Sequence, residues 1–427
     1  MSLARTTLLN GTATAARLAA ALVLNKLLAL FVGPAGFAVV GQFQSLMSIV
    51  LSAAGGVFSP GVTKLTAEHA SRPERQVGIL RSALTLGLVG GGVAGVLLLL
   101  LGPVLAERLL GDPSLVGAIF WLAAASVMLA LNNVLLAALS GLKKVNAYVA
   151  ASIAGSVLSA GSAALLVPLY GLYGGLIALP IGQALAGAVT LGLFRRARPT
   201  RWRDLVGRMR PDATRSLGGF ALMAAVTAIV VPVSQLVIRE GLMRLGGADL
   251  AGLWQAMWKL SETHLMLMTT TLSLYFLPRF AEISDGGELR REVARGYRFV
   301  VPMVIATALS IYLLRQPLTL LLFSPEFLPL AQALGWQLVG DVLKIASWVP
   351  AYTMISHART RLYIGTEVIF SMLVAVACLV GASQFGLAGA GAGYAATYAI
   401  YWLVLHWQLG HLARRLGSGN AGGAAER

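Results

Sequence analysis

Long apolar segments recur along this chain, and they constrain its fold more than any other feature. A helix needs about 20 mainly apolar residues to cross the hydrocarbon core of a bilayer. The mean hydropathy of +0.77 and the 12% share of charged residues are typical of such a protein. We therefore predict an all-α polytopic membrane protein with twelve transmembrane helices. The predicted spans are 8–32, 37–59, 78–102, 115–139, 146–168, 173–194, 216–239, 250–277, 298–315, 328–352, 362–384 and 389–411.

A basic run at 195–215 separates the apolar segments near the middle of the chain. It holds eight arginines and only two acidic residues, Asp204 and Asp212. Because positively charged loops are retained in the cytoplasm, we place this run there, and alternation then puts both termini on the same side. That side collects most of the 33 basic residues, while Arg239 is one of a few on the other. The run is either a solvated linker or an amphipathic helix lying on the headgroups.

The run divides the chain into halves that look like repeats. Trp121 and Trp336, and likewise Tyr148 and Tyr363, are separated by one constant offset. Six helices per half give both halves the same orientation, which predicts two pseudo-symmetric lobes around a central cleft where transporters bind substrate. The predicted parts are an N-lobe at 1–194, the basic linker at 195–215, a C-lobe at 216–412 and a disordered cytoplasmic tail at 413–427.

Composition and motifs exclude several functions. The net charge of +16 resides in short loops between spans, which favours contact with membrane lipids and argues against a nucleic-acid partner. A single cysteine, Cys378, excludes an intramolecular disulfide. The sequence contains no GxxxxGK[ST] loop and no HExxH or CxxC motif. We therefore expect a transporter without a cofactor, not an enzyme.

Ionisable residues inside predicted spans are candidate sites, because burying a charge in a bilayer is costly. The first span carries Arg17, Asn25 and Lys26, which we expect to line a cationic lumen, with snorkelling of Arg17 or Lys26 to the headgroups as the alternative. Lys259 lies three residues before Glu262. Lys259 either pairs with Glu262 or converges with Lys26 on an anionic ligand such as a diphosphate.

The span at 328–352 carries a polar stripe, Gln337, Asp341, Lys344 and Trp348, on one helical face. Asp341 and Lys344 either form an ion pair that locks two helices together or bind substrate and a coupling cation. Glu367 in the next span either takes up a proton or pairs with Arg359. The stripe therefore adds one residue to the predicted cationic lumen, Lys344. The predicted coupling or gating residues, toward H+ or Na+, are Asp341, Glu262, Glu367 and Gln337.

Several runs of the sequence resemble the Wzx flippases, in particular the lipid III flippases of enterobacterial common antigen and the O-antigen translocases. The similarity extends over almost the whole chain, and the most specific run covers 336–344. The runs that carry it are Asn25-Lys26-Leu27-Leu28-Ala29, Phe31-Val32-Gly33-Pro34-Ala35-Gly36, Gly61-Val62-Thr63-Lys64 and Trp336-Gln337-Leu338-Val339-Gly340-Asp341-Val342-Leu343-Lys344.

This resemblance implies a MATE-like fold of the multidrug/oligosaccharidyl-lipid/polysaccharide (MOP) exporter superfamily. It also implies a function, the movement of an undecaprenyl-diphosphate-linked oligosaccharide from the cytoplasmic to the periplasmic leaflet of the bacterial inner membrane by alternating access. A polysaccharide polymerase and a chain-length regulator are the protein partners that it suggests. Two alternatives stay open. A MATE-type drug or cation exporter would have an acidic lumen, and a membrane polysaccharide polymerase or ligase would have large periplasmic loops.

Overall fold

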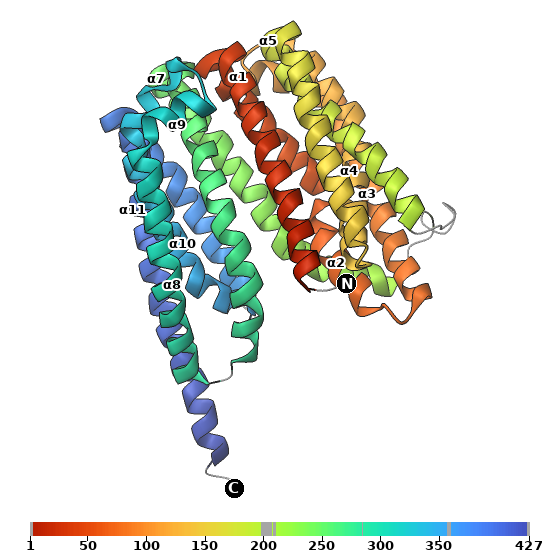
Figure 1. The fold of residues 1–427 in the computed structure, drawn as a ribbon, viewed down its shortest axis with the longest axis vertical. Helices are drawn as coiled ribbons and strands as arrows, with labels where there is room; N and C mark the ends of the chain where they lie inside the picture. Colours follow the sequence, from red (N-terminus) through yellow and green to blue (C-terminus); the bar gives the residue numbers. More distant parts are fainter. Residues whose placement is uncertain (1–2, 198–206, 208–210, 284, 357–359, 425–427) are drawn as a thin grey trace. The chain divides into compact units, whose positions relative to one another are not determined.

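The structure, a computed structural model, describes residues 3–197, 207, 211–283, 285–356 and 360–424, and their regular structure is helical (Figure 1). Most of the basic run lies outside these residues, so neither alternative for it is tested. The chain forms two compact units, Met1–Leu236 and Val237–Arg427. The helices are α1 (Leu3–Ala53), η1 (Gly56–Phe58), α2 (Ser59–Glu68), α3 (Pro73–Leu109), η2 (Pro113–Leu115), α4 (Val116–Gly141), α5 (Val145–Ala197), α7 (Pro211–Glu282), α8 (Gly286–Leu313), α9 (Arg315–Leu322), η3 (Pro325–Phe327), α10 (Pro329–Ser356) and α11 (Thr360–Ala424).

Seven helical stretches within the described residues are long and apolar enough to cross a membrane. The helix count therefore does not by itself confirm the twelve predicted spans. Four of the seven, in α1, α5, α7 and α11, contain residues with non-helical backbone angles. Helix α5, with 53 residues, would be about 80 Å long if straight, which exceeds a bilayer core of about 30 Å.

The break in α5 reverses the direction of the chain. Gly171 adopts φ 54° and ψ −128°, a conformation available to glycine. A Cβ at Gly182 would lie 2.7 Å from the Cα of Ser159, and a Cβ at Gly155 would lie 3.1 Å from the Cβ of Ala186. Since residues equidistant from Gly171 are in contact, α5 is a hairpin of two antiparallel helical segments.

The same breaks recur in the second unit. Gly386 in α11 has φ 58° and ψ −140°, close to the angles of Gly171, and follows it at the offset of the sequence repeat. Gly33 in α1, with φ 66° and ψ −176°, corresponds to Gly247 in α7, with φ 81° and ψ 176°, within one residue of that offset. The internal repeat is thus present in the backbone, as two sets of helices interrupted at equivalent glycines.

The first unit includes the beginning of α7, which the sequence assigned to the C-lobe. Leu217 is fully buried in a core with Leu84 and Leu135, and Ser52 donates a hydrogen bond to the carbonyl of Ala228 at 3.4 Å. The first compact unit therefore ends at Leu236, and the lobe boundaries on either side of the basic linker stay a prediction. At the other end of the chain, helix α11 continues to Ala424, past residue 413, where the predicted tail begins.

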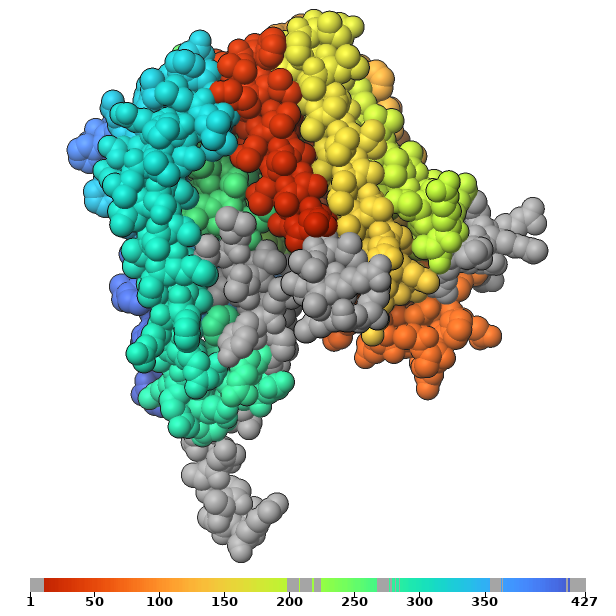
Figure 2. Space-filling model, viewed as in Figure 1, coloured from red at the N-terminus to blue at the C-terminus, as the bar shows by residue number. Residues whose placement is uncertain are grey.

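In the first unit α1 packs against α5, and α4 packs against both α3 and α5. Figure 2 shows α1 (red) and α5 (yellow) side by side on one face. The turn between α3 and α4 is fixed by Asp112, whose carboxylate accepts a hydrogen bond from the Ser114 amide at 2.8 Å. Hydrogen bonding by Ser114 lowers the pKa of Asp112, so this turn keeps its cap unless the solution is strongly acidic.

Candidate functional site

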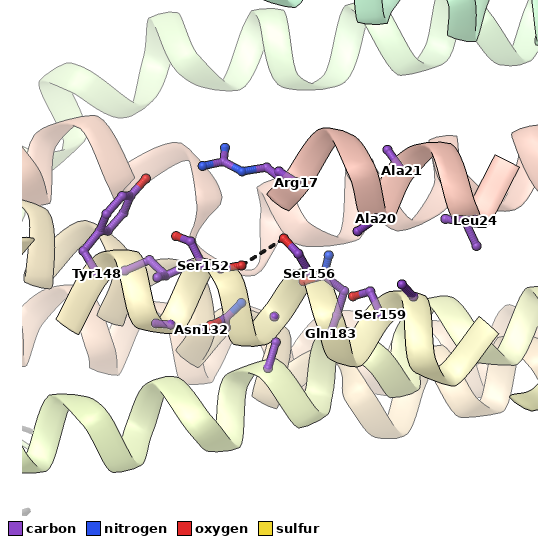
Figure 3. Close-up of a pocket in the computed structure, with 15 residues that line it drawn as sticks. Arg17, Ala20, Ala21, Leu24, Asn132, Tyr148, Ser152, Ser156, Ser159 and Gln183 are labelled. Atoms are coloured by element: carbon purple, nitrogen blue, oxygen red, sulfur yellow. Dashed lines mark hydrogen bonds between the residues drawn. The ribbon is translucent and has the colours of Figure 1, made fainter. Parts of the chain in front are cut away.

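A cavity of about 320 Å³ lies within the first unit, lined by α1, α4 and both segments of α5. Figure 3 shows Arg17 on α1 extending toward the end of the cavity where Tyr148 and Ser152 lie. Its volume falls at the lower end of the range typical of ligand sites, about 300–1,000 Å³. The lining consists of Arg17, Ala20, Ala21, Leu24, Asn132, Leu136, Tyr148, Ala151, Ser152, Gly155, Ser156, Ser159, Ala160, Gln183 and Ala186.

The lining offers hydrogen-bond donors and one positive charge. Arg17 is the charged residue of this set, and the lining residues include no carboxylate. Thr190 donates to the side-chain oxygen of Asn132 at 2.7 Å, which fixes the amide and leaves its NH2 group as a donor. Ser156 is oriented by its hydrogen bond to the carbonyl of Ser152, 2.9 Å away. An anionic, hydroxyl-rich ligand suits such a surface, because a guanidinium binds phosphate oxygens strongly.

Of the predicted residues of the first span, Arg17 lines this cavity. Asn25 is buried and Lys26 is half-buried, and both lie beyond the lining residue Leu24 on α1. The sequence interpretation missed the polar residues of α4 and α5. A signal was present in Ser152, Ser156 and Ser159, whose spacing places three hydroxyls on one face of an otherwise apolar helix.

The predicted polar stripe of α10 faces α7 and α11 in the second unit. Asp341 is fully buried, and its carboxylate accepts hydrogen bonds from Ser261 on α7 and from Tyr394 on α11, the latter at 3.0 Å. His264 Nδ1 lies 3.5 Å from the same carboxylate, and its Nε2 lies 2.8 Å from Thr307 Oγ1 on α8. Helices α7 and α11 therefore contact this acidic side chain of α10 directly, and α8 reaches it through His264.

Lys344 lies among aromatic rings, and within the part of the chain that the structure describes it forms no ion pair with Asp341. Its ammonium is 5.0 Å from the ring centre of Tyr398 and 5.1 Å from that of Trp258. Trp348 and Tyr394 complete the ring cluster at 5.6 and 5.7 Å. Cation–π attraction holds the charge in this position. The i, i+3 ion pair that the sequence allowed on α10 is thus replaced by contacts between helices.

Lys259 and Glu262 do form the pair that their spacing allows, with 2.8 Å between Nζ and Oε2. The Glu262 side chain is 50% exposed and that of Lys259 is 24% exposed. Glu367 is half-buried and interacts electrostatically with Lys344, while Arg359 lies outside the described residues. Lys259 belongs to the second unit and Lys26 to the first, so their convergence on one ligand stays a prediction.

Gln337 and Arg239 make further buried polar contacts in the second unit. Gln337 is 1% exposed and donates to the Ser261 hydroxyl at 3.3 Å. Arg239 is 2% exposed, and its guanidinium donates to Gln255 Oε1 at 2.6 Å across the break in α7. The sequence interpretation placed Arg239 among the charges of an outward loop. Its burial could not be read from hydropathy, which does not indicate which way a side chain points.

Comparison with known proteins extends these observations. A family model described as polysaccharide biosynthesis protein matches residues 27–332. The chain is 30% identical over 409 residues to the lipid III flippase of Escherichia coli (strain K12), covering 94% of this chain and 96% of the relative. The lipid III flippase of Shigella flexneri matches with the same identity and coverage.

The fold is shared with solved transporters. An inward-facing multidrug resistance MATE family transporter of the MOP superfamily superposes with a TM-score of 0.74 at 16% sequence identity, covering 97% of this chain and 96% of that one. The predicted all-helical, MATE-like fold is thereby confirmed. The family model matches most of the chain, and the two lipid III flippases align with nearly all of it. The chain therefore belongs to the polysaccharide biosynthesis protein family.

Proposed function

We propose that this protein is a flippase that moves an undecaprenyl-diphosphate-linked oligosaccharide, of the lipid III or O-antigen type, from the cytoplasmic to the periplasmic leaflet of the bacterial inner membrane. The observation that carries the proposal is the lining of the first-unit cavity, with the cation Arg17, several hydroxyls and amides, and no carboxylate among its residues. A diphosphate requires the cation, and the sugars require the hydroxyls and amides. The identity to two lipid III flippases supports the same substrate class.

The proposal includes a topology of twelve crossings with both termini in the cytoplasm. The broken helices α1, α5, α7 and α11 then cross twice each, and α3, α4, α8 and α10 cross once. Each segment on either side of a break has at least the length that a bilayer requires. The lobes alternate between inward-open and outward-open states about the basic linker, while the prenyl chain stays in the lipid.

The candidate residues take two roles in this mechanism. Arg17, Asn25, Lys26, Lys259 and Lys344 contribute to substrate binding, and Asp341, Glu262, Glu367 and Gln337 contribute to coupling or gating. The Asp341 cluster suits coupling to H+ or Na+, because its carboxylate contacts Ser261 and His264 on α7 and Tyr394 on α11, and loss or gain of its charge would change all three contacts. A polymerase and a chain-length regulator would then act on the product in the periplasmic leaflet.

The second unit argues against the drug-exporter alternative. An organic cation would be expected to bind between the rings of Trp258 and Tyr398, but the ammonium of Lys344 already occupies that position. The polymerase alternative would need large outward loops, and the described connection between α3 and α4 is a short turn around η2.

Alanine substitution of the two predicted lumen lysines tests the proposal in cells. Lys26→Ala or Lys259→Ala is expected to abolish surface polysaccharide in a strain that depends on this protein, with normal amounts of folded protein in the membrane. Lys144→Ala, which removes an exposed cation outside the cavity lining, should leave the polysaccharide unchanged. Normal polysaccharide from both lumen variants would remove these lysines from the mechanism.

A further inference from the structure

A second cavity of about 490 Å³ lies beside the first one in the same unit. It is formed where the start of α2 packs against the end of α4. A Cβ at Gly141 would lie 2.6 Å from the carbonyl oxygen of Thr63, so the two backbones are in close contact there. The lining consists of Ser59, Pro60, Thr63, Lys64, Asn133, Leu136, Ala137, Ser140 and Tyr148.

The two cavities are consecutive along α4 and α5. They share two lining residues, Leu136 and Tyr148. From Tyr148 the lining of the first cavity continues along α5 to Ser159, about 16 Å further at 1.5 Å per residue. The second cavity extends in the opposite direction, along α4 to Ser140 at the α4–α5 turn. We call the first cavity the inner chamber and the second the outer chamber.

The outer chamber has the same chemistry as the inner one. Lys64 is its charged residue and is exposed, and its lining residues include hydroxyls and the Asn133 amide but no carboxylate. Thr63 donates to the carbonyl of Ala137 at 3.2 Å, which fixes the turn of α2 that carries Lys64. The chamber lies at the end of α4 next to Lys143 and Lys144, a basic loop that the charge distribution places in the cytoplasm.

We propose that the outer chamber is a separate binding site for the diphosphate of a lipid-linked substrate, occupied before the inner chamber, and that Tyr148 separates the two. The identity of the substrate rests on the proposed function. The site itself rests on the position of Lys64, the donors around it and the residues shared with the inner chamber. The diphosphate would pass from the ammonium of Lys64 to the guanidinium of Arg17 along a surface whose lining residues include no carboxylate.

Charged thiol reagents test the sign and the order of the chambers. Cys378 is buried, and replacing it by alanine gives a background for single cysteines at Ser140 in the outer chamber and Ser152 in the inner one. At Ser140→Cys, an anionic methanethiosulfonate should react faster than a cationic one. The rate of each reagent is first divided by its rate with a small free thiol in solution, and the anionic-to-cationic ratio of these normalised rates is the measured quantity. Lys64→Ala should lower this ratio about tenfold, as expected for one charge at short range, whereas Lys144→Ala should not.

Tyr148→Ala should accelerate labelling of Ser152→Cys from the cytoplasmic side and leave that of Ser140→Cys unchanged. An unchanged ratio in Lys64→Ala, or equal labelling of Ser152→Cys with and without Tyr148, would overturn the proposal.

Protection experiments identify the anion. Farnesyl diphosphate should protect Ser140→Cys, and phosphatidylglycerol in phosphatidylcholine vesicles should not. Protection by phosphatidylglycerol alone would assign the chamber to ordinary lipid headgroups and contradict the proposal.

Transport kinetics separate this inference from the proposed function. In proteoliposomes that translocate a lipid-linked oligosaccharide, Lys64→Ala should raise KM about tenfold with little change in kcat, and Lys64→Arg should restore KM. If the wild type translocates and Lys64→Ala has the kinetics of Lys144→Ala, the outer chamber is not a binding site. If the wild type does not translocate, the proposed function is wrong, and the charge-selective labelling still tests the chamber.

Discussion

At the residue scale, the buried side chain of Arg239 stabilises the fold. Its hydrogen bond to Gln255 joins the two segments of α7 at a fully buried position. Removing one partner of a buried charged hydrogen bond costs about 1.5–3 kcal/mol. We therefore expect Arg239→Ala to lower the apparent Tm of the purified protein in detergent by about 5 °C, measured by thermal unfolding of its tryptophan fluorescence.

Arg244 provides the matched control on the same helix. Its side chain is 78% exposed and forms a 2.8 Å ion pair with Glu240, and exposed pairs contribute about 0–1 kcal/mol. Arg244→Ala should therefore change the apparent Tm by about 1 °C or less. Equal losses in the two variants would show that the contact with Gln255 does not stabilise the break in α7.

At the element scale, glycines with positive φ decide where the long helices reverse. Gly171→Ala introduces a Cβ into open space, so any loss of stability comes from the backbone conformation and not from a clash. Such a conformation costs a non-glycine residue about 1–3 kcal/mol. We expect Gly171→Ala to lower the apparent Tm by several degrees in the same thermal unfolding measurement.

Gly161 tests whether conformation is the cause. It also lies in α5 with open space at its Cβ position, but its φ is not positive. Alanine in a helix is about 0.5–1 kcal/mol more favourable than glycine, so Gly161→Ala should leave the apparent Tm unchanged or raise it. A loss at Gly161 as large as at Gly171 would contradict the role given to the positive φ.

The element scale also shows what the sequence could predict. The polar stripe of α10 was predicted from spacing alone, and all four of its residues contact other residues of the second unit. Their partners Ser261, His264 and Tyr394 could not be predicted, because helical periodicity identifies a face but not the helix opposite it. Likewise Arg17 stood out as a charge in an apolar span, whereas Asn132 and Gln183 become site residues only through the packing of α4 and α5.

At the scale of the whole molecule, the proposed twelve crossings depend on charge bias and helix length together. Alternation places the turn at Ser114 in the periplasm and Lys144 in the cytoplasm. In the background lacking Cys378, an impermeant maleimide added to cells with a permeable outer membrane should label Ser114→Cys. It should label Lys144→Cys only after the inner membrane is opened. Labelling of both sites in intact cells would contradict this topology.

The central claim is that the cation-lined cavity of the first unit carries a lipid-linked diphosphate across the membrane. Its most direct test is the rate at which a fluorescent undecaprenyl-diphosphate-linked oligosaccharide changes leaflet in proteoliposomes. The wild type should move it faster than protein-free vesicles, and Arg17→Gln should slow it at least tenfold, as about 1.4 kcal/mol or more of a charged hydrogen bond is lost. An Arg17→Gln variant as fast as the wild type, or a wild type no faster than empty vesicles, would contradict the claim.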